Sequence, residues 1–184
     1  MKKVVLLGDS IRLIGYGLKV PALLDSEFAV WQPEDNGRYS VYTLHAIMHY
    51  WLKELDGADV IHWNNGIWDV QIGVDGKPLI PLEDYVAVTL RIADILKERC
   101  RVLIFASTTP VLDGRPDIRN ADIEKYNAAV IPALRQKGVR INDLHAVVSE
   151  NIDQFLREDD FTHLTEAGIS ACAERTAAII RENV

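Results

Sequence analysis

Short apolar segments alternate along the chain with longer stretches in which apolar residues recur every three or four positions. The short segments predict five buried strands, at residues 4–7, 28–31, 60–63, 102–106 and 139–141. The longer stretches predict amphipathic helices, with apolar faces over residues 44–55, 85–96, 123–134 and 169–180. Thr165 is the expected N-cap of the last helix. This alternation predicts an α/β fold with a mostly parallel sheet that helices cover on both faces.

No repeat, linker or low-complexity tract interrupts the alternation, so we expect a single domain over residues 1–184. The longest irregular stretches, at residues 64–82, 107–121 and 150–162, follow or approach the carboxyl ends of predicted strands. Open α/β sheets carry their ligand sites at that edge. The chemistry of the protein is therefore expected in these loops.

The composition narrows the class of protein. The 184 residues carry a net charge of −7 and no run of Lys or Arg, which argues against nucleic-acid binding. Cys100 and Cys172 are expected to be buried reduced thiols, since two cysteines cannot form a disulfide framework. No segment approaches the ~20 apolar residues of a membrane span, and residues 4–7 are too short for a signal-peptide core. We expect a cytoplasmic protein without a membrane or nucleic-acid partner.

Gly8-Asp9-Ser10 directly follows the first predicted strand. A serine at this place has its hydroxyl at the carboxyl edge of the sheet, next to backbone N–H groups that can stabilise an oxyanion. Taken alone, the tripeptide equally suits an ordinary turn with an N-cap. Ser10 is nevertheless a candidate nucleophile.

A second segment, Asp160-Phe161-Thr162-His163, precedes the last predicted helix. Its spacing lets the Asp160 carboxylate accept a hydrogen bond from His163 Nδ1, which leaves Nε2 free to take a proton from a hydroxyl group. Asp159 is the alternative carboxylate partner of His163. Together with Ser10, the segment supplies a nucleophile, a base and an orienting carboxylate.

In the order Ser, Asp, His, these segments resemble the SGNH (GDSL-type) hydrolases, a superfamily of esterases and lipases. The resemblance implies a three-layer α/β/α, flavodoxin-like fold with a five-stranded parallel sheet in the order 2-1-3-4-5. It implies a catalytic triad of Ser10, Asp160 and His163. It also implies an oxyanion hole made of the backbone N–H groups of Ser10 and Gly37 and the side-chain amide of Asn64.

The third block of the family departs from its usual form in this chain. The family usually has Gly-x-Asn-Asp after the third strand, whereas this chain reads His62-Trp63-Asn64-Asn65-Gly66. Asn64 aligns with the oxyanion-hole asparagine, and Asn65 is the competing assignment. A branch of the superfamily with His-x-Asn-x-Gly followed by Trp-Asp is similar, and Trp68-Asp69 fits it.

Three further features have both a functional and a structural interpretation. Trp68 suits an acyl pocket or a stacking surface for a sugar ring, whereas Trp63 suits the sheet core equally well. Arg12 suits an anionic substrate group, or a structural ion pair with a nearby aspartate. His45 and His49 lie four residues apart but lack a third ligand, so we expect no metal site. Phosphate-binding glycine motifs are absent, and we expect no cofactor.

The sequence therefore predicts a serine ester hydrolase that works through an acyl-enzyme on a small-molecule ester. The short chain and the lack of a long apolar lid favour short acyl groups, acetyl above all, with O-acetylated carbohydrates as candidate substrates. A thioesterase or transacylase with the same site is one alternative. A non-catalytic glycan-binding module and an anion-binding flavodoxin-like domain are the others.

Overall fold

The computed structural model describes residues 1–184. Its centre is a five-stranded, all-parallel sheet with the strand order β2-β1-β3-β4-β5. The strands are β1 (Lys2–Leu7), β2 (Phe28–Trp31), β3 (Ala58–Asn64), β4 (Cys100–Ala106) and β5 (Arg140–Asn142). The five predicted strands, the parallel sheet and the order 2-1-3-4-5 are confirmed.

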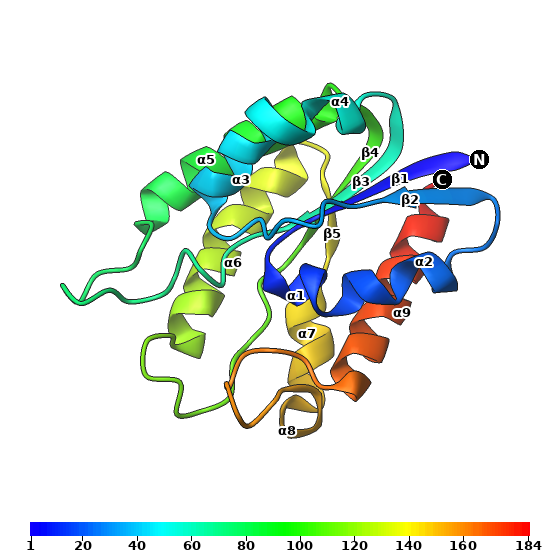
Figure 1. The fold of residues 1–184 in the computed structure, drawn as a ribbon. Helices are drawn as coiled ribbons and strands as arrows, with labels where there is room; N and C mark the ends of the chain where they lie inside the picture. The colour runs from blue at the N-terminus through cyan, green and yellow to red at the C-terminus, as the bar shows by residue number, and fades with distance from the viewer.

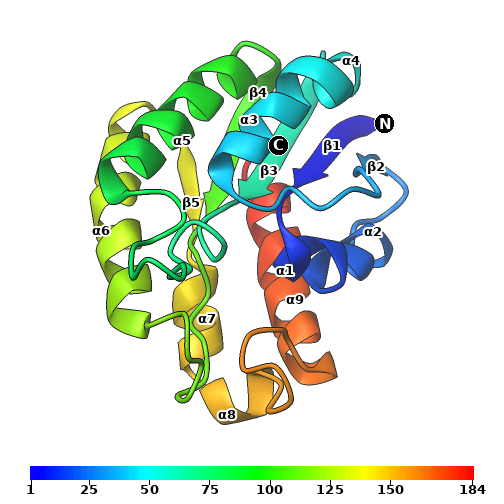
Figure 2. The same cartoon turned by 60° about the vertical axis from the view of Figure 1, so that its left-hand side comes forward.

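Helices cover both faces of the sheet and give the three-layer α/β/α arrangement (Figure 1). One face carries α3 (Ser40–Ala46), η2 (Ile47–Trp51), α4 (Leu52–Leu55), α5 (Leu82–Lys97) and α6 (Asn120–Gln136). The other carries α1 (Ser10–Leu13), η1 (Tyr16–Leu18), α2 (Val20–Leu23), α7 (Leu144–Ser149), α8 (Ile152–Phe155) and α9 (Glu166–Glu182). Figure 2 shows α3, α5 and α6 on one side of the strands, with α1 and α9 on the other. No helix combines the length and the hydropathy that a membrane crossing requires.

The two hydrophobic cores follow from the alternation of side chains along a strand. Val5 and Leu7 of β1 face the core under α5 and α6, whereas Val4 and Leu6 face the core under α9. Because both faces are covered, β1 reads as an unbroken apolar run and not as an alternating one. This explains why the strand was visible in the sequence.

The predicted helix over residues 44–55 differs in detail from the structure. The helical segment begins at Ser40 and contains a π-helical stretch, Ile47–Trp51, between two α-helical pieces. A π-bulge adds a residue to one turn, while the apolar residues on either side still face the sheet. By contrast, α9 begins as predicted, because the Thr165 hydroxyl accepts a hydrogen bond from the Gly168 N–H.

Candidate active site

Ser10 and His163 meet at the carboxyl edge of the sheet, although 153 residues separate them. Ser10 begins α1 immediately after β1, and His163 lies in the loop before α9. The Ser10 hydroxyl lies 2.9 Å from His163 Nε2, and His163 Nδ1 lies 2.9 Å from Asp160 Oδ2. An ionised carboxylate has no proton to donate, so the proton of this hydrogen bond belongs to His163 Nδ1. In the neutral imidazole, Nε2 then has a free lone pair that faces the Ser10 hydroxyl.

The turn that contains Asp160 fixes this carboxylate. Asp160 Oδ1 accepts hydrogen bonds from the backbone N–H groups of Thr162 (3.0 Å) and His163 (2.8 Å). Partial burial alone would raise the pKa of Asp160, but these hydrogen bonds and the contact with His163 lower it to about 2. The carboxylate therefore stays ionised beside His163. Asp159, the alternative partner, points to solvent and pairs with Arg157.

Asp9 caps α1 beside the candidate nucleophile. Its Oδ1 accepts a hydrogen bond from the Ile11 N–H at 2.9 Å, and only 1% of the residue is exposed. Burial raises the pKa of Asp9 to about 6, although hydrogen bonds from Asn64 and Ile11 act in the opposite direction. A titrating carboxyl group therefore lies directly behind Ser10.

Asn64 packs against the Gly8 backbone, two residues before Ser10. A Cβ added to Gly8 would lie 1.9 Å from Asn64 Oδ1, and Gly8 has a φ of +153°. The Tyr16 hydroxyl donates to Asn64 Oδ1 at 2.9 Å, which orients the amide nitrogen away from Tyr16. Gly8 is needed here because any side chain would displace the amide.

Asn65 has no free amide hydrogen. It is fully buried, and its Nδ2 donates to Thr43 Oγ1 at 2.9 Å and to the Arg38 carbonyl oxygen at 3.2 Å. A side-chain amide has two N–H bonds, and both are used. The geometry therefore favours Asn64 over Asn65 as the amide donor.

His62 occupies the position at which the family usually has glycine. The residue is fully buried, and burial lowers its pKa to about 3, so the imidazole is neutral. Its Nε2 accepts a hydrogen bond from Asn142 Nδ2 at 3.0 Å, and its ring packs edge-on against Tyr16. His62 thus supports Tyr16, which in turn orients Asn64.

Two predicted site residues have structural roles, and one of them is Gly37. Its backbone N–H donates to the Gly8 carbonyl oxygen at 2.9 Å, so the prediction that it donates to an oxyanion is wrong. A Cβ on Gly37 would lie 2.8 Å from the Gly8 carbonyl oxygen. Gly37 therefore allows the loop after β2 to pack against the backbone that precedes Ser10.

Arg12 is the second correction. The residue is completely buried, so the prediction that it contacts an anionic substrate group is wrong. Its guanidinium donates to the carbonyl oxygens of Pro33 (2.8 Å), Asp35 (2.7 Å) and Gly8 (3.2 Å). Arg12 fastens α1 to the loop after β2, and none of its hydrogen bonds is made to an aspartate carboxylate, so the predicted ion pair does not form.

A cavity of about 170 Å³ lies over Ser10 and His163. Trp68 lines it, as predicted, together with residues that the sequence analysis missed: Ile67, Gln71, Arg115, Ile118 and Thr162. Trp63 instead lies in the core, fully buried and edge-on to Phe105. The missed residues all come from the irregular stretches 64–82, 107–121 and 150–162, and apart from Thr162, which lies within the Asp160–His163 segment, no local motif marks them.

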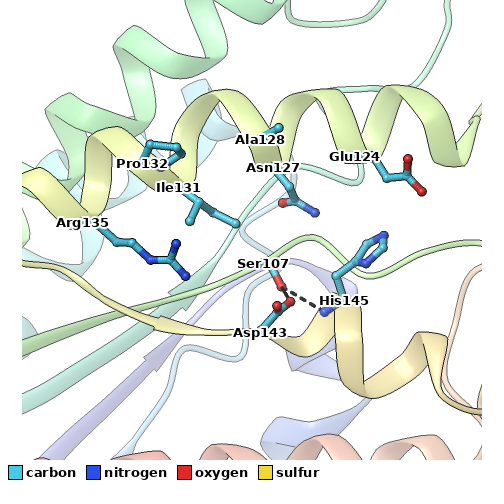
Figure 3. A pocket seen from close by; sticks show the side chains of 9 residues that line it. All are labelled: Ser107, Glu124, Asn127, Ala128, Ile131, Pro132, Arg135, Asp143 and His145. Carbon is cyan, nitrogen blue, oxygen red and sulfur yellow. Dashed lines mark hydrogen bonds between the residues drawn. The ribbon is translucent and has the colours of Figure 1, made fainter.

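A larger groove of about 470 Å³ lies between α6 and α7, at the ends of β4 and β5 (Figure 3). It contains Ser107, Asp143 and His145, a set that resembles a second triad by residue type. The Ser107 hydroxyl donates directly to Asp143 Oδ1 at 2.8 Å and accepts from the backbone N–H of His145. No hydrogen bond joins the imidazole to Ser107, so this set lacks the nucleophile–base contact.

The remaining histidines lie away from the site. His45 and His49 are exposed on the α3–η2 segment, with ring centroids 4.5 Å apart. No group of three or more His, Cys, Asp or Glu side chains is arranged to hold a metal ion. The cysteines are free, with Cys172 buried and Cys100 partly buried.

Several solved structures share the architecture of nearly the whole chain. A lipase/acylhydrolase from Enterococcus faecalis has a TM-score of 0.81 at 18% identity, over 99% of this chain and 96% of that one. The acetylxylan esterase Axe2 from Geobacillus stearothermophilus has a TM-score of 0.80 at 16% identity, over 97% and 94%. The acetyl xylan esterase AlAXEase has a TM-score of 0.80 at 15% identity, over 97% and 99%.

No family model matches the chain, and no curated protein matches it. The structural likeness therefore carries the comparison. The lipase/acylhydrolase and the acetylxylan esterases belong to the SGNH hydrolase superfamily. The chain has the SGNH hydrolase fold.

Proposed function

We propose that the protein is a serine ester hydrolase that works through an acyl-enzyme. The observation that carries this proposal is the continuous hydrogen-bonded chain from Ser10 through His163 to Asp160, with 2.9 Å at both steps. A hydroxyl is a weak nucleophile at neutral pH, and an adjacent base that is itself oriented by a carboxylate activates it. Ser10 and His163 line the same cavity as Trp68.

The reaction follows from these positions. Ser10 Oγ attacks the ester carbonyl while its proton moves to His163 Nε2, and Asp160 stabilises the resulting imidazolium. His163 then protonates the departing alkoxide, which leaves the acyl group on Ser10. Water, deprotonated by the same imidazole, attacks the acyl-enzyme and releases the carboxylic acid. The backbone N–H of Ser10 and the Asn64 amide are the proposed oxyanion donors.

Short acyl groups, acetyl above all, are the proposed substrates. A cavity of about 170 Å³ is small for an organic ligand, because ligand pockets usually measure about 300–1,000 Å³. Trp68 offers an aromatic surface on which a sugar ring can stack. Two structural neighbours are acetylxylan esterases, which supports the choice of O-acetylated carbohydrates for testing.

Covalent labelling tests the hydrolase assignment directly. A fluorophosphonate probe should label the wild-type protein at Ser10, and both the label and hydrolysis of p-nitrophenyl acetate should be lost in Ser10→Ala. The matched control is Ser107→Ala, which removes the serine of the neighbouring Ser-Asp-His set and should retain both. Loss of labelling in Ser107→Ala with retention in Ser10→Ala would overturn the assignment.

A substrate panel tests the acyl preference. Acetyl, butyryl and octanoyl p-nitrophenyl esters, acetylated xylooligosaccharides and acetyl-CoA are compared against the Ser10→Ala background. Faster cleavage of the octanoyl ester than of the acetate would contradict the short-acyl proposal, whereas preferential cleavage of acetyl-CoA would indicate a thioesterase. Glycan binding without Ser10-dependent turnover would indicate a binding module.

A further inference from the structure

Arg115 joins the wall of the Ser10 cavity to the turn that carries Asp160 and His163. It comes from the long connection between β4 and α6, and its side chain is 25% exposed. Nη1 donates to the Asp160 carbonyl oxygen at 2.9 Å, and Nε donates to Asp117 Oδ1 at 2.6 Å. A guanidinium can make both contacts at once because its N–H groups point in fixed, diverging directions.

Asp117 fixes the direction of this guanidinium. Its Oδ2 accepts from Gln71 Nε2 at 2.5 Å, and its carbonyl oxygen accepts from the Ile72 N–H at 2.7 Å. Burial raises the pKa of Asp117, but hydrogen bonds from Arg115 and Gln71 outweigh this effect and leave it below the ordinary value. Asp117 therefore remains charged, and the loop after β3 is tied to Arg115 through it.

The turn at Asp160 needs such support because its backbone is unusual. Phe161 has a φ of +63°, a conformation that non-glycine residues rarely adopt. The carbonyl oxygen of Phe161 accepts from the Leu112 N–H at 2.8 Å, so the β4–α6 connection holds two successive carbonyls of the turn. A rotation of these peptides would move the Asp160 carboxylate away from His163 Nδ1.

We propose that Arg115 is a positioning residue, which holds the Asp160–His163 turn from within the wall of the Ser10 cavity, with Asp117 fixing its orientation. The inference rests on the proposed hydrolase function for its kinetic consequence. Its contact with Asp160 is independent of that function. Arg115 acts on the reaction through Asp160 and not through the ester itself.

Steady-state kinetics with p-nitrophenyl acetate give the first test. Misplacement of a catalytic group lowers turnover, so Arg115→Gln should lower kcat roughly tenfold and change KM by less than about twofold. Arg115→Lys keeps the charge and one donor nitrogen in place of three, so it should recover part of this loss, and Asp117→Asn should give an intermediate loss. Arg101→Gln removes an exposed arginine that pairs with Asp59, and it should match the wild type.

A double-mutant cycle separates positioning from a general structural effect. Residues that act through one another are not additive, so Arg115→Gln should change the Ser10 labelling rate by less than about twofold in an Asp160→Asn background. An equal loss in the two backgrounds, or an effect confined to KM, would overturn the inference. Thermal unfolding of each variant checks that the comparison is made between folded proteins.

Amide hydrogen exchange measures the turn without any catalysis. The N–H groups of Thr162 and His163 both donate to Asp160 Oδ1, and they should exchange roughly tenfold faster in Arg115→Gln when the turn opens more often. Unchanged exchange at both amides overturns the inference. If the wild-type protein shows no Ser10-dependent hydrolysis, the proposed function fails, and the exchange measurement alone decides whether Arg115 holds the turn.

Discussion

We expect the buried Asp9 carboxyl group to stabilise the folded protein less and less as the pH rises from about 4 to about 6. Burial raises the pKa of Asp9 from 3.8 to about 6 in the folded protein. Between these values the folded state binds more protons than the unfolded state. Raising the pH through this window therefore favours the unfolded chain, in which the carboxylate is hydrated.

The size of the effect follows from the two pKa values. One pKa unit corresponds to about 1.36 kcal/mol, so the interval from 3.8 to about 6 corresponds to about 3 kcal/mol of unfolding free energy. Asp9→Asn removes the ionisation and keeps a side-chain oxygen that can cap α1. The stability of the variant relative to the wild type should therefore rise by about 2 kcal/mol between pH 4 and pH 7, because part of the full difference is already present at pH 4.

Urea denaturation of both proteins at pH 4, 5, 6 and 7 measures this difference. Groups that do not interact with the Asp9 charge, such as His62, contribute equally to both proteins and cancel in the comparison, whereas Asp69, whose pKa is raised to about 6 mainly by burial and also by Asp9, titrates somewhat lower in the variant. Asp153→Asn, which removes an exposed carboxylate on α8, is the control and should follow the pH dependence of the wild type. A constant difference between Asp9→Asn and the wild type across pH 4–7 would refute the reasoning.

Three further substitutions test the packing around the site. Gly8→Ala should cost about 1–3 kcal/mol in backbone strain alone and should abolish fluorophosphonate labelling, because its Cβ would displace Asn64. Trp63→Ala should lower stability in urea by about 3–5 kcal/mol while the fold is retained, since it empties a fully buried site. Thr165→Ala should cost about 1 kcal/mol in the same assay, and no loss would show that its cap hydrogen bond to Gly168 contributes little.

The sheet could be predicted because each central strand corresponds to a short apolar run in the sequence. In β1 every residue from Val4 to Leu7 is fully buried, since helices cover both faces, and this produces a continuous apolar run. The order of the strands required more than local pattern. It came from the resemblance of the Gly8–Ser10 and Asp160–His163 segments to a known family.

The short helices could not be predicted in the same way. The segments α2 and α8 have four residues each, which is barely more than one turn and too short for a periodic pattern. The π-helical stretch at Ile47–Trp51 was also missed, because its extra residue leaves the flanking apolar positions on the same side. The spacing of apolar residues shows which face of a helix is buried, but it does not distinguish an α-helical turn from a π-helical one.

Two of the predicted site residues were misplaced for a common physical reason. The sequence showed that Gly37 and Arg12 could donate hydrogen bonds at the correct edge of the sheet. It did not show that the Gly8 carbonyl oxygen already accepts from Gly37, or that Pro33 and Asp35 accept from Arg12. Whether a donor is free for a substrate depends on acceptors that folding brings to it, and these belong to other loops.

Arg115 is the opposite case, because it lies at the site but no sequence motif identifies it. Its contact with the Asp160 carbonyl oxygen spans 45 residues and is made to the backbone, so it requires no particular side chain at the partner. A contact of this kind produces no motif, whereas the Asp160–His163 pair is only three residues apart and does. The candidate catalytic groups are therefore easier to identify from this sequence than the groups that hold them in place.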